Sequence, residues 1–239
     1  GDVYKRQMHD GMTLPIFPVQ LFRPKAVNAR PVVSTISGGT SLSGIEDVIA
    51  TDGGGRRVVE YSDIQLRTPE QLRAWSAWAG YLAGGTIECL VPIVSLATGP
   101  RQFAWDGPTR VSKLVADDPV FPQSVTYSIP QIKAVLAADT PLRGTSVAID
   151  LISRGEITGG EKFSIAGNGF RVVRETAPGV YLVTPPARQA LAEGADVNFD
   201  WPVVRCRLQP NFDMEAAINM GRFMSPSITF VESPPVGGI

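Results

Sequence analysis

The chain has 239 residues with a formal net charge of −1, and 44% of its residues are hydrophobic while 19% are charged. That length suits one large or two modest domains, and the composition predicts a packed core rather than a disordered chain. The charge balance excludes a strongly basic nucleic-acid-binding surface, and no apolar run reaches the ~20 residues of a membrane-spanning helix.

The first 31 residues fall into two parts. Residues 1–7 read GDVYKRQ, in which DVYKRQ is the translation of an adapter used in sequencing libraries, so we interpret them as an assembly artefact and expect the natural start at Met8 or Met12. Residues 8–31 are rich in proline and large apolar residues. Because proline disrupts helices and central strands, we predict an extended N-terminal arm or edge strand that lies against a partner.

Residues 32–66 have the pattern of strands and turns. VVSTIS is β-branched, GGTSLSG has turn chemistry, and VVEYSDIQL is again strand-like. Asp52–Gly53, between apolar segments, predicts a hairpin turn. The loop DGGGRR (52–57) could cradle a phosphate, but it lacks the GK[ST] ending of a P-loop, so a solvated turn is the favoured interpretation.

Residues 67–85 predict one helix. Thr68 is suited to cap it, Pro69 to its first position, and Gln71 completes a capping box. Gly84–Gly85 is a fitting end. The helix has an apolar stripe at helical spacing, formed by Leu72, Trp75, Trp78, Ala79 and Leu82. We interpret this tryptophan-bearing stripe as a face that packs on a sheet rather than as a ligand platform.

The second half is mostly strand-like. A strand is expected at 86–94, residues 97–111 are loop-like, and 113–138 give mixed signals. From Arg143, short strands alternate with turns at Gly159–Gly160, Gly167–Gly169 and Pro178–Gly179, and SITFVES (227–233) is the last strand. Short strands with regularly spaced turns indicate a small barrel or sandwich.

Side chains that carry catalysis are scarce. His9 is the only histidine, and Cys89 and Cys206 stand in apolar strand-like contexts without a CxxC pair. We therefore predict no catalytic residues, no metal ligands and no cofactor, and expect that the chain is not an enzyme. The cysteines are expected to be buried thiols, although a disulfide between them stays open.

Two further pairs have a functional and a structural interpretation. Glu156 and Glu161 could serve glycoside hydrolysis, but surface charge is favoured. Trp201 beside Phe199 could stack on a sugar, but core packing or a subunit interface is favoured.

Taken in order, five segments resemble the distal-tail family of tail-tip proteins in tailed bacteriophages, found in siphophages and prophages. They are residues 34–66, the capped helix with the strand after it, GGEKFSIAGNGFRVV (159–173), PPARQALAEGADVNFDWPVVRCRL (185–208) and SITFVES. The resemblance spans most of 32–233 and is weakest over 113–143. Ala187 also stands where the family tends to carry Leu.

The resemblance implies a mainly β fold: a β-sandwich ring (belt) domain with one α-helix, from residues 32–111 and 208–235, and a small β-barrel-like domain inserted at 112–207. It also implies a structural virion protein of the tail tip or baseplate that self-associates into a ring, commonly a hexamer. The implied partners are the tail tube, tape-measure and hub or tip proteins, assembled in the cytoplasm of the bacterial host.

The family has no catalytic residues, so the resemblance assigns none. An alternative stays open at this point, namely a carbohydrate-binding β module of a phage tip or cell surface. That module requires exposed aromatic side chains on one face of the second domain.

Overall fold

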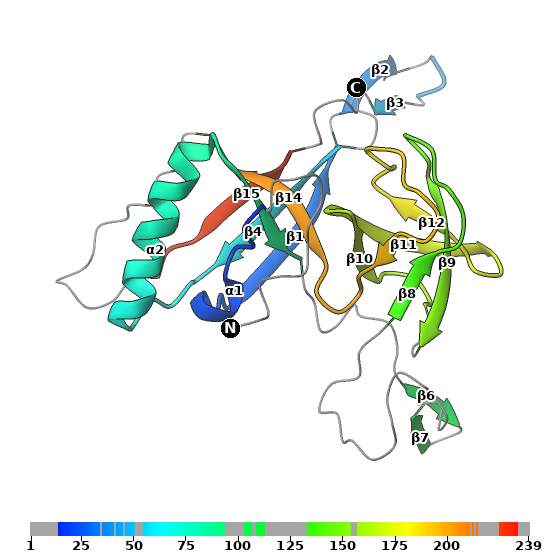
Figure 1. Ribbon diagram of the computed structural model, residues 1–239. Coiled ribbons are helices and arrows are strands. Elements are labelled where there is room, and N and C mark those ends of the chain that lie inside the picture. Colours follow the sequence, from blue (N-terminus) through cyan, green and yellow to red (C-terminus); the bar gives the residue numbers. More distant parts are fainter. Residues whose placement is uncertain are drawn as a thin grey trace. The chain divides into compact units, whose positions relative to one another are not determined.

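The computed structural model describes residues 14–33, 35–40, 42–44, 46–50, 55–93, 103–106, 109–112, 133–153, 157–210, 212, 214 and 225–233. Residues 1–7, interpreted above as an adapter artefact, lie outside these ranges. The chain divides into two compact units, the first from residues 1–93 and 204–235 and the second from 94–203 and 236–239. The fold is mainly β, as predicted, and in sequence the second unit interrupts the first (Figure 1).

The first unit is built on a five-stranded sheet with the strand order β1-β4-β15-β14-β5. Neighbouring strands are antiparallel from β1 to β14. Its strands are β1 (Ala26–Val32), β4 (Arg56–Ser62), β5 (Glu88–Pro92), β14 (Val203–Leu208) and β15 (Ile228–Glu232). The unit also contains the helices α1 (Val19–Phe22) and α2 (Pro69–Leu82), the 3-10 turn η1 (Ala83–Gly85), and a separate hairpin of β2 (Thr35–Thr40) and β3 (Glu46–Ala50).

Helix α2 begins as the sequence predicted. The Thr68 hydroxyl accepts a hydrogen bond from the Gln71 backbone N–H at 3.2 Å, and the Gln71 side chain accepts one from the Thr68 N–H at 3.2 Å. This reciprocal pair satisfies two N–H groups that lack partners inside the helix. The helix is followed by Gly84, whose φ of 65° suits glycine. The prediction of a capped helix is confirmed.

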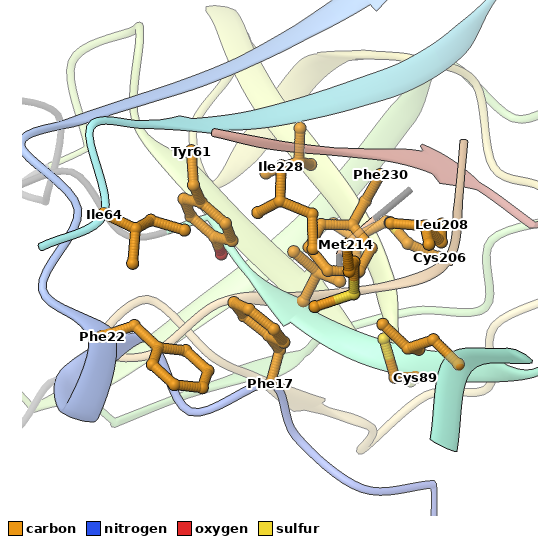
Figure 2. Packing of buried hydrophobic residues seen from close by; sticks show 14 of the residues in the cluster. Phe17, Phe22, Tyr61, Ile64, Cys89, Cys206, Leu208, Met214, Ile228 and Phe230 are labelled. Atoms are coloured by element: carbon orange, nitrogen blue, oxygen red, sulfur yellow. The ribbon is translucent and has the colours of Figure 1, made fainter. Parts of the chain in front are cut away.

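One face of the five-stranded sheet is covered by α2 and α1. Alternate residues of the strands point into this layer, including Tyr61 and Phe230 (Figure 2). Trp75 and Leu82 of α2 belong to the same buried cluster. The Trp75 indole N–H donates a hydrogen bond to the Met214 carbonyl at 2.8 Å, and the Tyr61 hydroxyl donates one to the Pro92 carbonyl. The tryptophan stripe therefore faces a sheet, as interpreted from the sequence.

Residues 14–31 differ from the expected arm. The Phe17 ring lies 5.0 Å from that of Phe230, and the Phe22 ring 5.3 Å from that of Trp75, between centroids. Both phenylalanines are buried, so this segment packs into its own first unit rather than extending to a partner (Figure 2). The edge-strand alternative does describe β1, which lies at a sheet edge and contains Pro31. Residues 8–13 lie outside the described part.

The second unit is built on a six-stranded sheet with the order β10-β11-β12-β9-β8-β13. Its strands are β8 (Lys133–Leu136), β9 (Ser146–Ser153), β10 (Lys162–Ile165), β11 (Asn168–Ala177), β12 (Val180–Thr184) and β13 (Asp196–Val197). A bridge between Ser164 of β10 and Asn198, directly after β13, joins the two edges. The sheet is therefore barrel-like, as predicted, and a two-stranded hairpin of β6 (Phe103–Asp106) and β7 (Thr109–Ser112) adds to this unit.

The division between the units differs from the expected one. The sequence placed the change at 111/112 and the return at 207/208, whereas the first unit ends at Ile93 and resumes at Val204. The return comes earlier because Val204, Cys206 and Leu208 of β14 alternate into the core of the first unit. The segment DVNFDWPVVRCRL thus contributes to both units.

Candidate functional site

The hairpin of β2 and β3 exposes large apolar side chains. Ile36 is 60%, Val48 57% and Ile49 55% exposed, and Leu42 in the connecting turn is fully exposed at 112%. Ile36 lies directly opposite Ile49 on one face of the hairpin, and Val48 lies opposite Ser37 on the other. All six residues of β2 are exposed. Exposed apolar groups gathered on one element are typical of an interaction surface.

The local sequence explains this hairpin. The register shifts between Ser37 and Thr40, where Gly39 adopts a φ of 90° and its N–H donates a hydrogen bond to the Ser37 hydroxyl at 3.3 Å. Glycine tolerates that conformation without steric strain. The sequence identified the turn residues here but not the exposure of Ile36, Val48 and Ile49. Their β-branched pattern is the same as that of a buried strand, so no signal in the sequence separated the two.

The hairpin turn predicted at Asp52–Gly53 lies outside the described residues. In the described residues, β3 pairs with β2, while β4 pairs with β1 and β15. The loop was also expected to be solvated, but Arg57 is buried and its backbone N–H donates a hydrogen bond to the Glu232 carboxylate at 2.8 Å. The interpretation as a solvated turn is therefore wrong for Arg57, because β4 already begins at Arg56.

A charged cluster lies on the sheet face opposite to the core. The Glu88 carboxylate accepts hydrogen bonds from Arg207 Nη2 at 2.8 Å and from the Ser233 hydroxyl at 2.6 Å, and Arg205 Nε lies 3.2 Å from its other oxygen. Partial burial raises the pKa of Glu88, but the bonds from Ser233 and Arg207 and the two arginine charges outweigh it and lower the pKa below its ordinary value. The cluster therefore keeps Glu88 ionised.

The two cysteines are both buried and carry free thiols. Burial, followed by the charge of Glu88, raises the pKa of the Cys89 thiol to about 12, and burial raises the pKa of Cys206 in the same direction. A nucleophilic cysteine needs a lowered pKa and access to solvent, so these thiols are packing groups, as predicted. Across the ranges that the structure describes, no group of three or more His, Cys, Asp or Glu side chains is placed to hold a metal ion.

Only one residue of the acidic pair predicted from the sequence, Glu161, lies in the described part of the chain. Glu156 lies outside the described residues. Glu161 is buried, and its carboxylate accepts hydrogen bonds from the Thr158 N–H at 2.9 Å, the Thr158 hydroxyl at 3.0 Å and the Gly159 N–H at 2.7 Å. This residue therefore shapes the turn before β10, a role that differs from the expected surface charge.

The aromatic pair Phe199 and Trp201 has a packing role. Phe199 is buried against Phe163, with 5.2 Å between ring centroids, and Trp201 is half-buried. The Asn198 side chain closes the turn from Asn198 to Trp201. It donates a hydrogen bond to the Trp201 carbonyl and accepts one from the Trp201 N–H, each at 2.9 Å. The other aromatic residues of the second unit with a described exposure, Phe163, Phe170 and Tyr181, are buried, so these side chains do not form a sugar-stacking platform.

Comparison with known proteins gives no family for the chain. No protein-family model matches it, and no curated protein matches it significantly. In the described part of the chain, no helix is both long and apolar enough to cross a membrane. Among the described residues, the exposed apolar side chains of the β2–β3 hairpin mark the candidate functional surface.

Proposed function

We propose that this chain is a structural protein of a bacteriophage tail tip, of the distal-tail type, and that it self-associates into a ring. The observation that carries the proposal is the apolar hairpin of β2 and β3, with Ile36, Val48 and Ile49 each more than half exposed. An isolated two-stranded hairpin is marginally stable in water, so apolar groups on both of its faces favour burial against another molecule.

The molecule that buries the hairpin in this proposal is a second copy of the same chain. The ordered motifs described from the sequence resemble a ring-forming family, and a ring repeats one contact between different surfaces of neighbouring copies. Each copy then offers its hairpin to the next and receives one in turn. In the assembled virion the ring joins the tail tube to the tip and adhesion apparatus, with the tape-measure and hub proteins as further partners.

The assembly test uses the purified full chain. Native mass spectrometry is expected to show a closed oligomer, six copies by the family resemblance, at an integer multiple of the 25.6 kDa chain mass. Negative-stain images are expected to show rings of one size. A monomer at high concentration, with no rings in the images, contradicts the proposed function.

A double variant tests the hairpin itself. Ile36→Ser with Ile49→Ser removes two exposed apolar side chains and is expected to weaken each contact by about 3 kcal/mol, or roughly 100-fold in dissociation constant, if both are buried in the ring. The matched control is Ile152→Ser with Val173→Ser, which changes two residues of the second unit that are 50% and 49% exposed. If rings form equally well in the hairpin variant and in the control, the contact between neighbouring copies does not involve the hairpin.

A further inference from the structure

Glu88 lies at the junction of two stretches of chain that are far apart in the sequence. It is the first residue of β5, the last strand of the first unit before the second unit begins. The sheet neighbour of β5 is β14, which brings the chain back. Because the second unit is inserted between these two strands, side-chain and backbone contacts have to hold them together.

The shell of Glu88 consists of hydrogen-bond donors. One carboxylate oxygen accepts from Arg207 Nη2 at 2.8 Å, from Arg207 Nε at 3.2 Å and from the Ser233 hydroxyl at 2.6 Å, while the other lies 3.2 Å from Arg205 Nε. Arg205 and Arg207 belong to β14, and Ser233 directly follows β15. The carboxylate therefore connects three strands at one end of the sheet.

We propose that Glu88 is an acid-sensitive clamp that holds β5, β14 and the end of β15 together. An ionised carboxylate only accepts hydrogen bonds, so it can accept all four of these contacts. A protonated carboxyl group adds its own O–H donor to a shell that already contains two cationic guanidinium groups. Protonation therefore removes the charge attraction to Arg205 and Arg207 and requires at least one donor to turn away. The clamp is closed near neutral pH and open in acid.

The surrounding charges set the pH range of the clamp. Arg205 and Arg207 face Glu88 from β14, while the neighbours Cys89 and Glu232 point to the core side of the sheet. There the Glu232 carboxylate accepts a hydrogen bond from the Arg57 backbone N–H. The lowered pKa of Glu88 means that the folded state binds its proton less readily than the unfolded state does. The stabilisation is thus fully present above the unfolded pKa of about 4.3 and is lost as the pH falls from there through the lower pKa of the folded state.

Hydrogen exchange followed by mass spectrometry tests the clamp within one chain. The Ser233 N–H donates to the Arg205 carbonyl at 3.0 Å, so a peptide covering 226–233 reports whether the end of β15 stays paired. After correction for intrinsic exchange rates, we expect protection of this peptide to fall up to about fivefold between pH 6 and pH 3, the size typical of a partly exposed charge network. Glu88→Gln is expected to show the lower protection already at pH 6 and a flat pH response.

Two variants keep the test specific. Glu60→Gln changes a carboxylate on the same sheet face in β4 and is expected to leave the pH response intact. Ser233→Ala removes one donor but retains both arginine charges, so it is expected to preserve a pH response of reduced size. Equal protection at pH 6 and pH 3 in the original chain, or the same loss in Glu60→Gln, overturns the proposal. Because the readout is intramolecular, it does not depend on ring formation.

Discussion

Ser164 and Asn198 exchange two backbone hydrogen bonds, at 3.0 and 2.9 Å, and thereby join the edges of the six-stranded sheet. The Ser164 hydroxyl also accepts a hydrogen bond from the Val203 N–H at 3.0 Å, in a buried position. One residue of β10 thus closes the barrel-like sheet and fixes the first residue of β14. The contact ties Val203, the last residue of this stretch of the second unit, to the barrel-like sheet.

Replacing Ser164 tests this link. Ser164→Ala leaves the Val203 N–H buried without its acceptor and is expected to destabilise the chain by about 1–3 kcal/mol in urea unfolding. Ser146→Ala changes an exposed serine of β9 and is expected to stay within about 0.5 kcal/mol of the original chain. Equal midpoints for both variants contradict the role of the Ser164 hydroxyl.

Local patterns in the sequence predicted some elements well. The capping box of Thr68 and Gln71 acts within one turn of helix, so its outcome depends on neighbouring residues alone. The strand-like context expected around Cys206 is likewise present, as β14. The link between Ser164 and Asn198 joins residues far apart in the sequence, and no local pattern specifies such a pairing.

Exposure was the harder property to predict. Ile36 and Phe17 are both large apolar residues near turn or proline signals, yet the first is largely exposed and the second is buried. Their difference depends on which element lies opposite, which is a tertiary property. The candidate surface on β2 and β3 therefore could not be predicted from the sequence. The same holds for the Glu88 cluster, because its four residues come from three separate segments of the chain.

Glu161 is expected to be needed for stability. Glu161→Gln replaces one carboxylate oxygen by an NH2 group, which places a donor against the N–H of Thr158 or Gly159. We expect a loss of about 1–3 kcal/mol, measured by thermal or urea unfolding. The matched control is Glu175→Gln, since the Glu175 carboxylate accepts from the Gly179 N–H at 3.0 Å in an exposed turn. The control is expected to cost less than about 0.5 kcal/mol of unfolding free energy. A larger loss in Glu175→Gln than in Glu161→Gln contradicts the prediction.

The buried thiols predict a stability that decreases in alkaline solution. The pKa of Cys89 is raised to about 12 and that of Cys206 is also raised, both first by burial. Unfolded thiols ionise near pH 8.5, so between about pH 8.5 and 12 the unfolded chain binds fewer protons than the folded chain, and stability falls as pH rises. We expect about 1 kcal/mol of loss per thiol between pH 7.5 and 9.5 in urea unfolding.

Thiol labelling provides the control for that pH effect. An aromatic disulfide reagent is expected to leave Cys89 and Cys206 unmodified in the folded chain at pH 8 and to label both in urea, since the two thiols are free and buried. The double variant Cys89→Ala with Cys206→Ala is expected to have a shallower dependence of stability on pH over the same range. Rapid labelling of the folded chain disagrees with the burial of these residues.

Phe17 tests whether the N-terminal segment belongs to the first unit. Its ring lies 5.7 Å from that of Tyr61, 5.4 Å from that of Trp78 and 5.0 Å from that of Phe230, between centroids. The backbone there is also tied to β5, because the Phe17 N–H donates to the Leu90 carbonyl at 2.8 Å. Phe17→Ala is therefore expected to cost about 3–5 kcal/mol of unfolding free energy, the usual range for a buried phenylalanine.

The matched control for Phe17 is Val32→Ala, at the 47% exposed end of the neighbouring strand β1. It is expected to cost less than about 1 kcal/mol, because little apolar area is lost from a side chain that is already half in water. An arm that extended away to a partner would instead give an isolated chain indifferent to Phe17→Ala, with the loss appearing only in assembly. Comparing unfolding of the dilute monomer with the yield of rings separates these two outcomes.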